Sequence, residues 1–269
     1  MKKLVSCLIS ILVLVLSTNS FPQWVSASGN LNNYFANAFS IEAVDSNYAV
    51  ISTDKLYRPS NGGRSWDTLT PPTFSNYAFH AIDISMTDSL NIWVGNMAGE
   101  ITFTSDGGKN WTIQFKDTSK TKFINYIKMF DPQNGIAMGD GKNASDPALF
   151  LRTSNGGANW VSVNDSAFGA WSGDTWRKVD FVSPDVGYFF ESGVYPQSIY
   201  KTTDGCKTWK QIQTPAFVEV LKFYDERIGY IYCSAPNIST LYRKPRMAGI
   251  PGMRFLLLTM PIGEWILSS

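Results

Sequence analysis

The stretch Phe103–Trp111, FTSDGGKNW, decides how this chain folds. It places an acidic residue, two glycines and a tryptophan within nine positions, and the same pattern recurs three times. The other copies are RPSNGGRSW, RTSNGGANW and KTTDGCKTW, which end at Trp66, Trp160 and Trp209. Successive tryptophans are 45, 49 and 49 residues apart. This period is typical of the four-stranded blades of a propeller.

The residue types of this motif favour a tight hairpin turn over a catalytic site. The Asp or Asn side chain can accept hydrogen bonds from backbone N–H groups further along the turn, and the glycine after it adopts positive φ without steric cost. The preceding Ser or Thr can add a weaker bond, and the tryptophan buries a large ring against the neighbouring sheet. The expected structural residues are Ser60, Asn61, Gly62 and Trp66; Ser105, Asp106, Gly107 and Trp111; Ser154, Asn155, Gly156 and Trp160; and Thr203, Asp204, Gly205 and Trp209.

A second recurrent segment belongs to the same repeat. It consists of an apolar strand, a tight turn and another apolar strand, as in AIDISMTDSLNIWVG and YIKMFDPQNGIAMG. The expected turn residues are Asp88, Asp131, Asp185 and Asp225. No helical periodicity of useful length interrupts these segments. Each repeat therefore makes a four-stranded meander, and the chain is expected to be an all-β propeller.

These residues resemble the Asp-box, or BNR, repeat, S/T-x-D-x-G-x-x-W, over about residues 24–242. Bacterial sialidases, some glucanases and sortilin-type receptors share that repeat. The doubled glycine, the upstream strand pair and the blade length look most like the photosystem II stability/assembly factor family. The resemblance implies a propeller of about seven blades, of which this chain holds about five. It further implies a scaffold that binds a protein or peptide partner across its loop rim or channel.

The beginning of the chain differs in composition from the repeats. Residues 1–20 have the charged, apolar and small-polar order of a secretory signal peptide. The apolar run is shorter than the roughly 20 residues that span a bilayer, so no stable membrane span is expected after cleavage. The mature protein is therefore expected to be secreted, periplasmic or on the cell surface.

The end of the chain also departs from the repeats. The incomplete propeller is assigned to residues 21–243, and residues 244–269 lack the turn motif that is due there. In a neighbouring frame, back-translation of Pro245–Gly252 permits Thr-Thr-Asp-Gly-Gly-Asn-Ser-Trp, so this tail is expected to be frameshifted. We then expect an open arc with an unpaired edge, an orphaned strand near Trp24–Ala27, and an apolar run FLLLTM that is poorly ordered or adhesive.

Composition excludes several classes of function. A chain of 269 residues with 44% apolar content can bury a substantial core, and a net charge of +1 without blocks of like charge argues against a nucleic-acid partner. No phosphate loop, zinc pattern or calcium loop is present, so no metal or cofactor is expected. Whether Cys206 and Cys233 pair stays open. His80, the only histidine, is expected to be structural.

Candidate functional residues are expected on the rim opposite the motif turns, where a rigid scaffold holds the loops. The binding candidates combine aromatic surface with both charges: Trp171, Asp174, Trp176, Arg177, Lys142 and Tyr195. The alternative is a glycoside hydrolase of the Asp-box propeller type, sialidase- or glucanase-like, that acts on a carbohydrate through two of the carboxylates Asp140, Asp174 and Glu191. The eight arginines offer no evident trio for a sialic acid carboxylate, because most lie in or beside motif turns or in the tail. A sortilin-like peptide receptor domain is a third possibility, and a non-enzymatic scaffold is the favoured interpretation.

Overall fold

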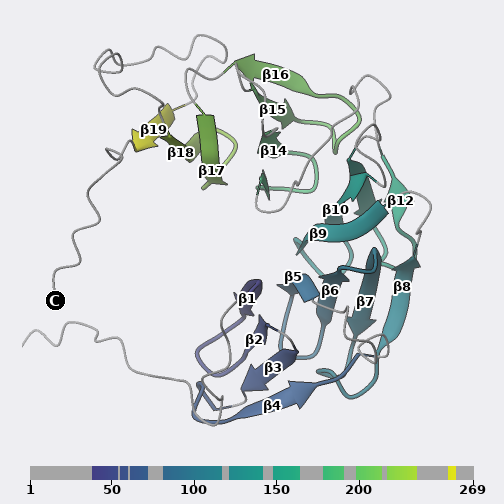
Figure 1. Cartoon of the computed structure of the whole chain (residues 1–269). Coiled ribbons are helices and arrows are strands. Elements are labelled where there is room, and N and C mark those ends of the chain that lie inside the picture. The colour runs from purple at the N-terminus through teal and green to yellow at the C-terminus, as the bar shows by residue number, and fades with distance from the viewer. Residues whose placement is uncertain are drawn as a thin grey trace, which may run out of the picture.

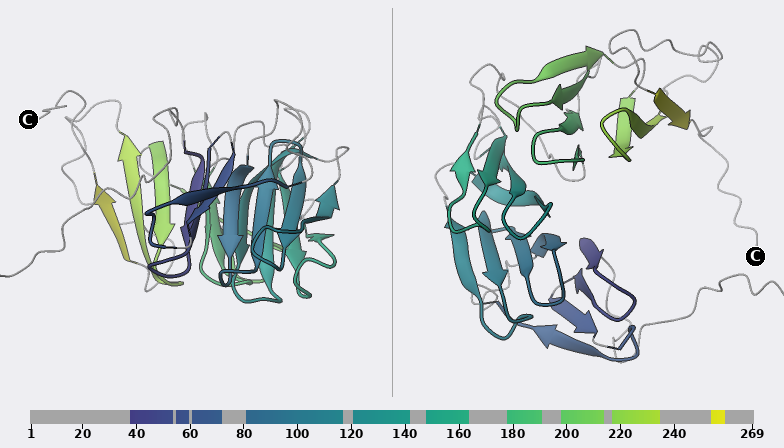
Figure 2. Two further views of the ribbon diagram at one scale, coloured as in Figure 1. Left: turned by 90° about the horizontal axis from the view of Figure 1, so that it is seen from below. Right: turned by 180° about the vertical axis from the view of Figure 1, so that it is seen from behind.

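The computed structural model describes residues 38–53, 55–59, 61–71, 81–116, 121–141, 148–163, 178–190, 198–213, 217–234 and 254–258. Within these ranges all helical or extended structure is β-strand, organised in five sheets that follow one another along the chain. The sheets stand side by side as the blades of an open arc, with their first strands toward its centre (Figure 1). The view from behind shows the same arc, and the view from below shows the strands standing side by side (Figure 2).

Four blades have four strands in sequence order, and the fifth has three. Blade 1 consists of β1 (Ser40–Ala43), β2 (Ala49–Ser52), β3 (Leu56–Pro59) and β4 (Trp66–Leu69). Blade 2 consists of β5 (Ala81–Met86), β6 (Ile92–Asn96), β7 (Glu100–Thr104) and β8 (Thr112–Lys116). Blade 3 consists of β9 (Thr121–Met129), β10 (Gly135–Gly141), β11 (Leu149–Thr153) and β12 (Val161–Ser162). Blade 4 consists of β13 (Val179–Phe181), β14 (Gly187–Phe190), β15 (Ser198–Thr202) and β16 (Lys210–Gln213), and blade 5 of β17 (Phe217–Phe223), β18 (Ile228–Ser234) and β19 (Arg254–Leu258).

Each of the first four blades is an antiparallel meander. In blade 2, Ile84 lies opposite Val94, and Val94 lies opposite Thr102 on the next strand. Every residue of β6 is buried, because this sheet is covered on both faces by neighbouring blades. Such strands are continuous apolar runs instead of the alternation that a half-exposed sheet would show.

The hydrophobic core is divided into four clusters, one at each junction between successive blades. At the first junction, Val50 and Leu69 of blade 1 pack with Ile84 and Met86 of blade 2. Equivalent clusters join blades 2 and 3, blades 3 and 4, and blades 4 and 5. Each blade therefore contacts only its neighbours, so stability is approximately a sum of blade and junction contributions.

The fifth sheet departs from the pattern at its third strand. β19 pairs in parallel with β18, with Tyr230 opposite Leu256, whereas the third strands of the other blades are antiparallel to the second. A parallel neighbour needs a long crossover instead of a short turn, and residues 235–253 provide that length. The edge of β18 is therefore paired, and β19 is the last strand of the sheet. The occupying strand uses Phe255–Leu258, from the run expected to be poorly ordered or adhesive.

Several sequence-based assignments lie outside the described residues. They are the signal peptide 1–20, the strand near Trp24–Ala27, Ser60, His80 and the tail apart from 254–258. The domain boundaries and the frameshift stay predictions, and the nucleotide sequence around codon 244 tests the latter. Across the described ranges, no helix is long and apolar enough to cross a membrane.

Candidate functional site

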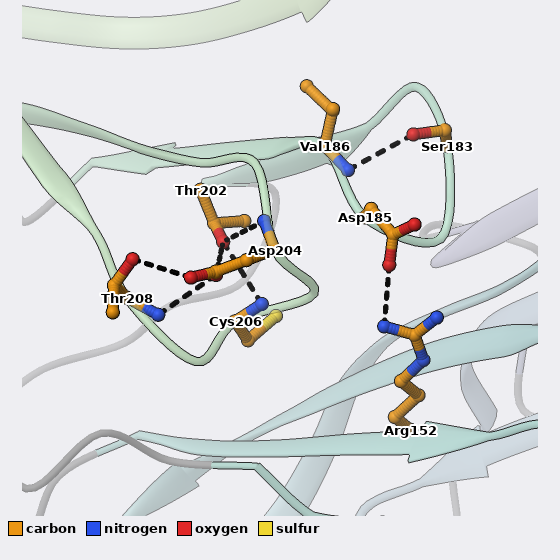
Figure 3. A network of polar contacts seen from close by, with 8 residues as sticks. All are labelled: Arg152, Ser183, Asp185, Val186, Thr202, Asp204, Cys206 and Thr208. Carbon is orange, nitrogen blue, oxygen red and sulfur yellow. Dashed lines mark hydrogen bonds and ion pairs between the residues drawn. The ribbon is translucent and has the colours of Figure 1, made fainter.

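The motif turns connect the third and fourth strands of blades 1 to 4. In blade 2, Asp106 Oδ1 accepts hydrogen bonds from the N–H groups of Lys109 and Asn110 at 2.9 Å each, and Asn110 Nδ2 donates to Asp106 Oδ2 at 2.7 Å. Asn155 and Asp204 each accept the equivalent bond four residues on, at 2.9 Å (Figure 3). These bonds replace ladder bonds that the turn cannot make.

Two consecutive residues of each turn have left-handed backbone. In blade 2 they are Gly107 at φ 71° and Gly108 at φ 93°, a conformation that glycine adopts at no steric cost. In blade 4 the second position is Cys206, a non-glycine residue at φ 71° whose thiol is free and buried. Burial raises the pKa of the Cys206 thiol well above its ordinary value. A buried, protonated thiol is a poor nucleophile and a poor metal ligand, so Cys206 serves packing.

In blades 2 to 4, the hydroxyl that completes the turn belongs to the residue before the expected one. Thr104 Oγ1 donates to Asp106 Oδ1 at 2.8 Å and accepts the N–H of Gly108 at 2.9 Å. Thr153 and Thr202 make the same pair of bonds in blades 3 and 4. The residues to which the sequence analysis gave this bond are exposed: Ser105, Ser154 and Thr203. The overlooked signal is the first position of the S/T-x-D pattern, which holds threonine in three of the four copies.

The motif tryptophans pack against the preceding blade. Trp111, Trp160 and Trp209 each belong to the cluster at the junction on that side. Gln114 of blade 2 binds the turn of blade 3: its Nε2 donates to the carbonyl of Gly156 at 2.9 Å, and its Oε1 accepts the Trp160 Nε1–H at 3.3 Å. The motif therefore joins successive blades as well as closing its own hairpin.

The basic residues that open three of the nine-residue motif stretches reach across to the next blade. Arg58 Nη1 donates to the carbonyl of Gly107 at 2.5 Å, across the first junction. Arg152 Nη1 lies 2.7 Å from Asp185 Oδ1 across the third (Figure 3). Lys201 Nζ donates to a turn carbonyl of blade 5 at 3.2 Å. These side chains align neighbouring blades, a role that their sequence positions did not indicate.

The turn between the first and second strands uses an Asp side chain in four blades. Asp131 Oδ1, for example, accepts the N–H groups of Gln133 and Asn134 at 2.7 and 2.8 Å. Hydrogen bonds from the Asn134 side chain and from these N–H groups lower the pKa of Asp131. In blade 4 the equivalent position is Ser183, whose Oγ accepts the Val186 N–H at 3.1 Å (Figure 3). Asp185 lies in this turn, as the sequence predicts, but its carboxylate pairs with Arg152 of blade 3.

The inner strands form a concave wall with titratable side chains that the sequence analysis missed. We define this wall by Glu42, Asp83, Tyr126, Lys128, Asp180 and Lys222. Their common signal is a polar residue within an otherwise apolar strand, as in AIDIS and VLKFY. The wall lies at the centre of the arc, where propellers commonly bind ligands.

Several wall residues bind the edge of the next inner strand. Asp83 Oδ2 accepts the N–H of Ile127 at 2.9 Å, and Asp180 Oδ2 accepts the N–H of Phe223 at 2.7 Å. The Tyr126 hydroxyl accepts a third such N–H, that of Phe181, at 3.2 Å. An inner strand has one free edge, and side chains of the preceding blade satisfy these edge groups.

The environment of the wall shifts its ionisation. Burial raises the pKa of Asp83 to about 6, although the N–H of Ile127 and the Ser40 hydroxyl partly oppose the shift. Burial also raises the pKa of Glu42, against the attraction of Lys128 and Lys222. The pKa of Lys128 is lowered by burial. Perturbed groups that interact with one another mark a candidate functional site, although structural networks produce similar shifts.

The exposed charges of the wall are the ones available to a ligand. Lys222 pairs with the buried Asp180 at 2.8 Å while 72% of its own side chain stays exposed. Lys128 Nζ donates to the carbonyl of Phe181 at 2.6 Å and is partly exposed. With Glu42, the wall presents both signs of charge on rigid strands, an arrangement suited to recognising a charged chain segment.

The loop candidates lie outside the described residues: Trp171, Asp174, Trp176, Arg177, Lys142, Tyr195 and Glu191. Asp140 lies near the end of β10 and is partly buried. Of the three candidate glycosidase carboxylates, the described part of the chain therefore includes Asp140 alone. Within that part, no group of three or more His, Cys, Asp and Glu side chains could hold a metal ion.

The chain was compared with known proteins in sequence and in fold. No protein-family model matches the chain. The photosystem II assembly lipoprotein Ycf48 of Synechococcus sp. (strain CC9902) is 25% identical over 139 residues, which is 49% of this chain and 38% of that protein. YCF48 bound to D1 peptide superposes with a TM-score of 0.54 at 15% identity, covering 75% of this chain and 65% of the other.

Two solved structures of other kinds share the architecture. A chain of the nidogen/laminin complex matches with a TM-score of 0.53 at 12% identity, over 73% of this chain and 72% of that one. The Niastella koreensis GH74 enzyme matches with a TM-score of 0.51 at 14% identity, over 72% of this chain and 33% of the enzyme. The chain is a β-propeller. At these identities the propeller likeness concerns the fold alone, and the chain spans under two fifths of the curated relative's length.

Proposed function

We propose that this propeller is an exported, non-enzymatic scaffold that binds a segment of another protein, similar to photosystem II assembly factors. Similarity in sequence and in fold to one kind of protein carries the proposal. About half of the chain resembles the assembly lipoprotein Ycf48, and three quarters of it has the fold of YCF48 bound to D1 peptide.

The concave wall is the surface that we assign to binding. Its side chains project from paired strands, so little ordering is needed when a partner arrives, and this lowers the entropic cost of association. Lys222 and Lys128 offer donors to carboxylates and carbonyls, and Glu42 accepts from amines and N–H groups. A segment with both signs of charge therefore fits the wall.

The direct test is peptide binding. Fluorescence anisotropy with a labelled D1 peptide, and selection from a displayed random peptide library, should reveal saturable binding to the full chain. Lys222→Gln keeps a donor toward Asp180 but removes the charge, and it should weaken binding at least tenfold. Lys207→Gln is the matched control, because Lys207 is exposed on a motif turn of blade 4.

Three outcomes would count against parts of this proposal. Absence of saturable binding by either probe contradicts the scaffold. Binding that survives Lys222→Gln but is lost in Trp171→Ala, with the fold intact, moves the site from the wall to the loop rim. Hydrolysis of aryl glycosides or polysaccharides that Asp140→Asn or Asp174→Asn abolishes contradicts the non-enzymatic part.

Export is tested separately. The sequence of residues 1–20 supports cleavage near Ser20. Cell fractionation followed by N-terminal sequencing should find the mature protein outside the cytoplasm with its new N-terminus close to that residue. A cytoplasmic protein that begins at Met1 contradicts export without touching the binding proposal.

A further inference from the structure

Every junction between blades is built on one pair of positions in the repeat. We count from the Asp or Ser side chain that accepts N–H groups in the turn between the first and second strands, here called the turn residue: Asp45, Asp88, Asp131, Ser183 and Asp225. The first position lies five residues after the turn residue of a blade, on its second strand. The second lies four residues before the turn residue of the next blade, on that blade's first strand. In the first junction these residues are Val50 and Ile84, which share a hydrophobic cluster.

The same pair recurs at the other three junctions. It is Trp93 with Ile127 in the second cluster, Ile136 with Val179 in the third, and Tyr188 with Leu221 in the fourth. All eight side chains at these positions are at most 7% exposed. The pair therefore marks where the trailing face of one blade meets the leading face of the next.

Among the described residues, one member of each kind has no blade packed against it. Tyr230 is the trailing residue of blade 5 and is 48% exposed, whereas Ile41 is the leading residue of blade 1 and is 62% exposed. Ile228, beside Tyr230, is also exposed. The two faces stand at opposite ends of the open arc, so those of one copy do not cover each other (Figures 1 and 2).

The internal junction also contains a hydrogen bond that the two exposed faces could form with each other. Tyr188, the counterpart of Tyr230, donates its hydroxyl to the carbonyl of Glu226 in the next blade's turn at 2.8 Å. The residue equivalent to Glu226 in blade 1 is Ser46, next to the turn residue Asp45. A leading face of blade 1 placed against Tyr230 would thus offer both the apolar contact and the carbonyl acceptor.

We propose that the trailing face of blade 5, around Tyr230, docks on the leading face of blade 1, around Ile41, in a second copy of this chain. The contact repeats the internal junction between copies, so it is head to tail, and a pair of copies still has one free face of each kind. Such a heterologous contact grows into rings or filaments. The proposal is independent of the peptide-binding function.

The test uses charge placed on either face of the full chain. Sedimentation velocity over a wide concentration range should show that the wild-type chain self-associates. Tyr230→Glu alone and Ile41→Glu alone should each lower the association constant at least tenfold. An equimolar mixture of the two variants should form one-to-one complexes that grow no further, because the mixture retains one intact face of each kind.

Controls keep the result specific. Val161→Glu changes a residue that is 60% exposed on the outer strand β12 and should associate like the wild type. Tyr230→Ser and Ile41→Ser repeat the test with smaller perturbation, and near-ultraviolet circular dichroism confirms that each variant is folded. The proposal is overturned by a monomeric wild type, by a mixture that stays monomeric, or by association that survives either face variant.

Discussion

Gly157 is a residue at which even a single added methyl group should destabilise the fold. Its backbone lies at φ +85°, and a Cβ there would collide with the side chain of Gln114, which bridges blades 2 and 3. We expect Gly157→Ala to lower the free energy of unfolding by about 1–3 kcal/mol, through backbone strain and a displaced Gln114.

Urea denaturation measures this effect against a matched neighbour. Ala158→Ser alters the exposed residue next in the turn and should stay within about 0.5 kcal/mol of the wild type. Equal midpoints for Gly157→Ala and the wild type would show that the turn tolerates a side chain at this position.

Asp83 should make stability depend on pH in the direction opposite to most carboxylates. Its folded pKa is about 6, above the roughly 3.9 of an unfolded chain, so the folded state binds the extra proton. Stability therefore rises as pH falls from 7, by about 1 kcal/mol at pH 5. Asp83→Asn should remove this dependence, as urea midpoints at the two pH values will show. A wild-type midpoint that is unchanged or lower at pH 5 contradicts the assignment.

The turn aspartates act in the other direction at lower pH. Hydrogen bonds lower the pKa of Asp131 and Asp225 in the folded state, so their contribution is present above the unfolded pKa and is lost as pH falls through the folded value. Together with Asp83, they place the maximum of stability in mildly acid solution.

At the scale of the element, the blade junction is the unit that carries stability. Tyr188 is fully buried, stacks on Phe223 of the next blade with ring centroids 3.4 Å apart, and donates to a turn carbonyl of that blade. Tyr188→Ala should therefore cost about 3–5 kcal/mol, as for other large core truncations. Thermal or urea unfolding of the purified variant measures this loss.

Tyr230→Ala is the matched control for that prediction. Tyr230 occupies the same position of the repeat, but no further blade of the described chain covers it, and it is partly exposed. Its removal should cost less than about 1 kcal/mol under monomeric conditions. Similar losses for the two variants would mean that burial at the junction does not govern stability.

The strand β19 shows how an element depends on its connection. In blades 1 to 4 the third strand returns antiparallel to the second, and the motif turn then adds a fourth strand. The fifth repeat ends without that motif, and the apolar residues of β19 pair in parallel with β18 instead. A third strand thus pairs with the edge of β18 although the motif turn is missing, but it runs parallel instead of antiparallel.

At the scale of the whole molecule, a linear array of blades should not be uniformly stable. Blades 2 to 4 are covered on both faces, whereas blades 1 and 5 each have one neighbour among the described residues. Native-state hydrogen exchange should find the slowest amides in β6, β10 and β14, and faster exchange in β2 and β18. One common exchange rate across the five blades would indicate all-or-none unfolding instead.

The sequence by itself determined the fold class, and the all-β propeller is confirmed. It could do so because the decisive interactions are local: Asp106 binds residues three and four positions away, and the glycines after it set the turn without help from the rest of the chain. The repeat distance then multiplied one local signal into a series of sheets. The similarity to photosystem II assembly factors was likewise readable from these residues.

Only the tertiary structure decided which side chains meet between blades. Asp83 binds a backbone group 44 residues away, and the Asp185 carboxylate pairs with Arg152, 33 residues before it. No local pattern encodes such partners, because the choice depends on how each sheet is placed against the next. The concave wall and the two uncovered faces arise from that placement, since each gathers residues from different blades that are remote in the chain.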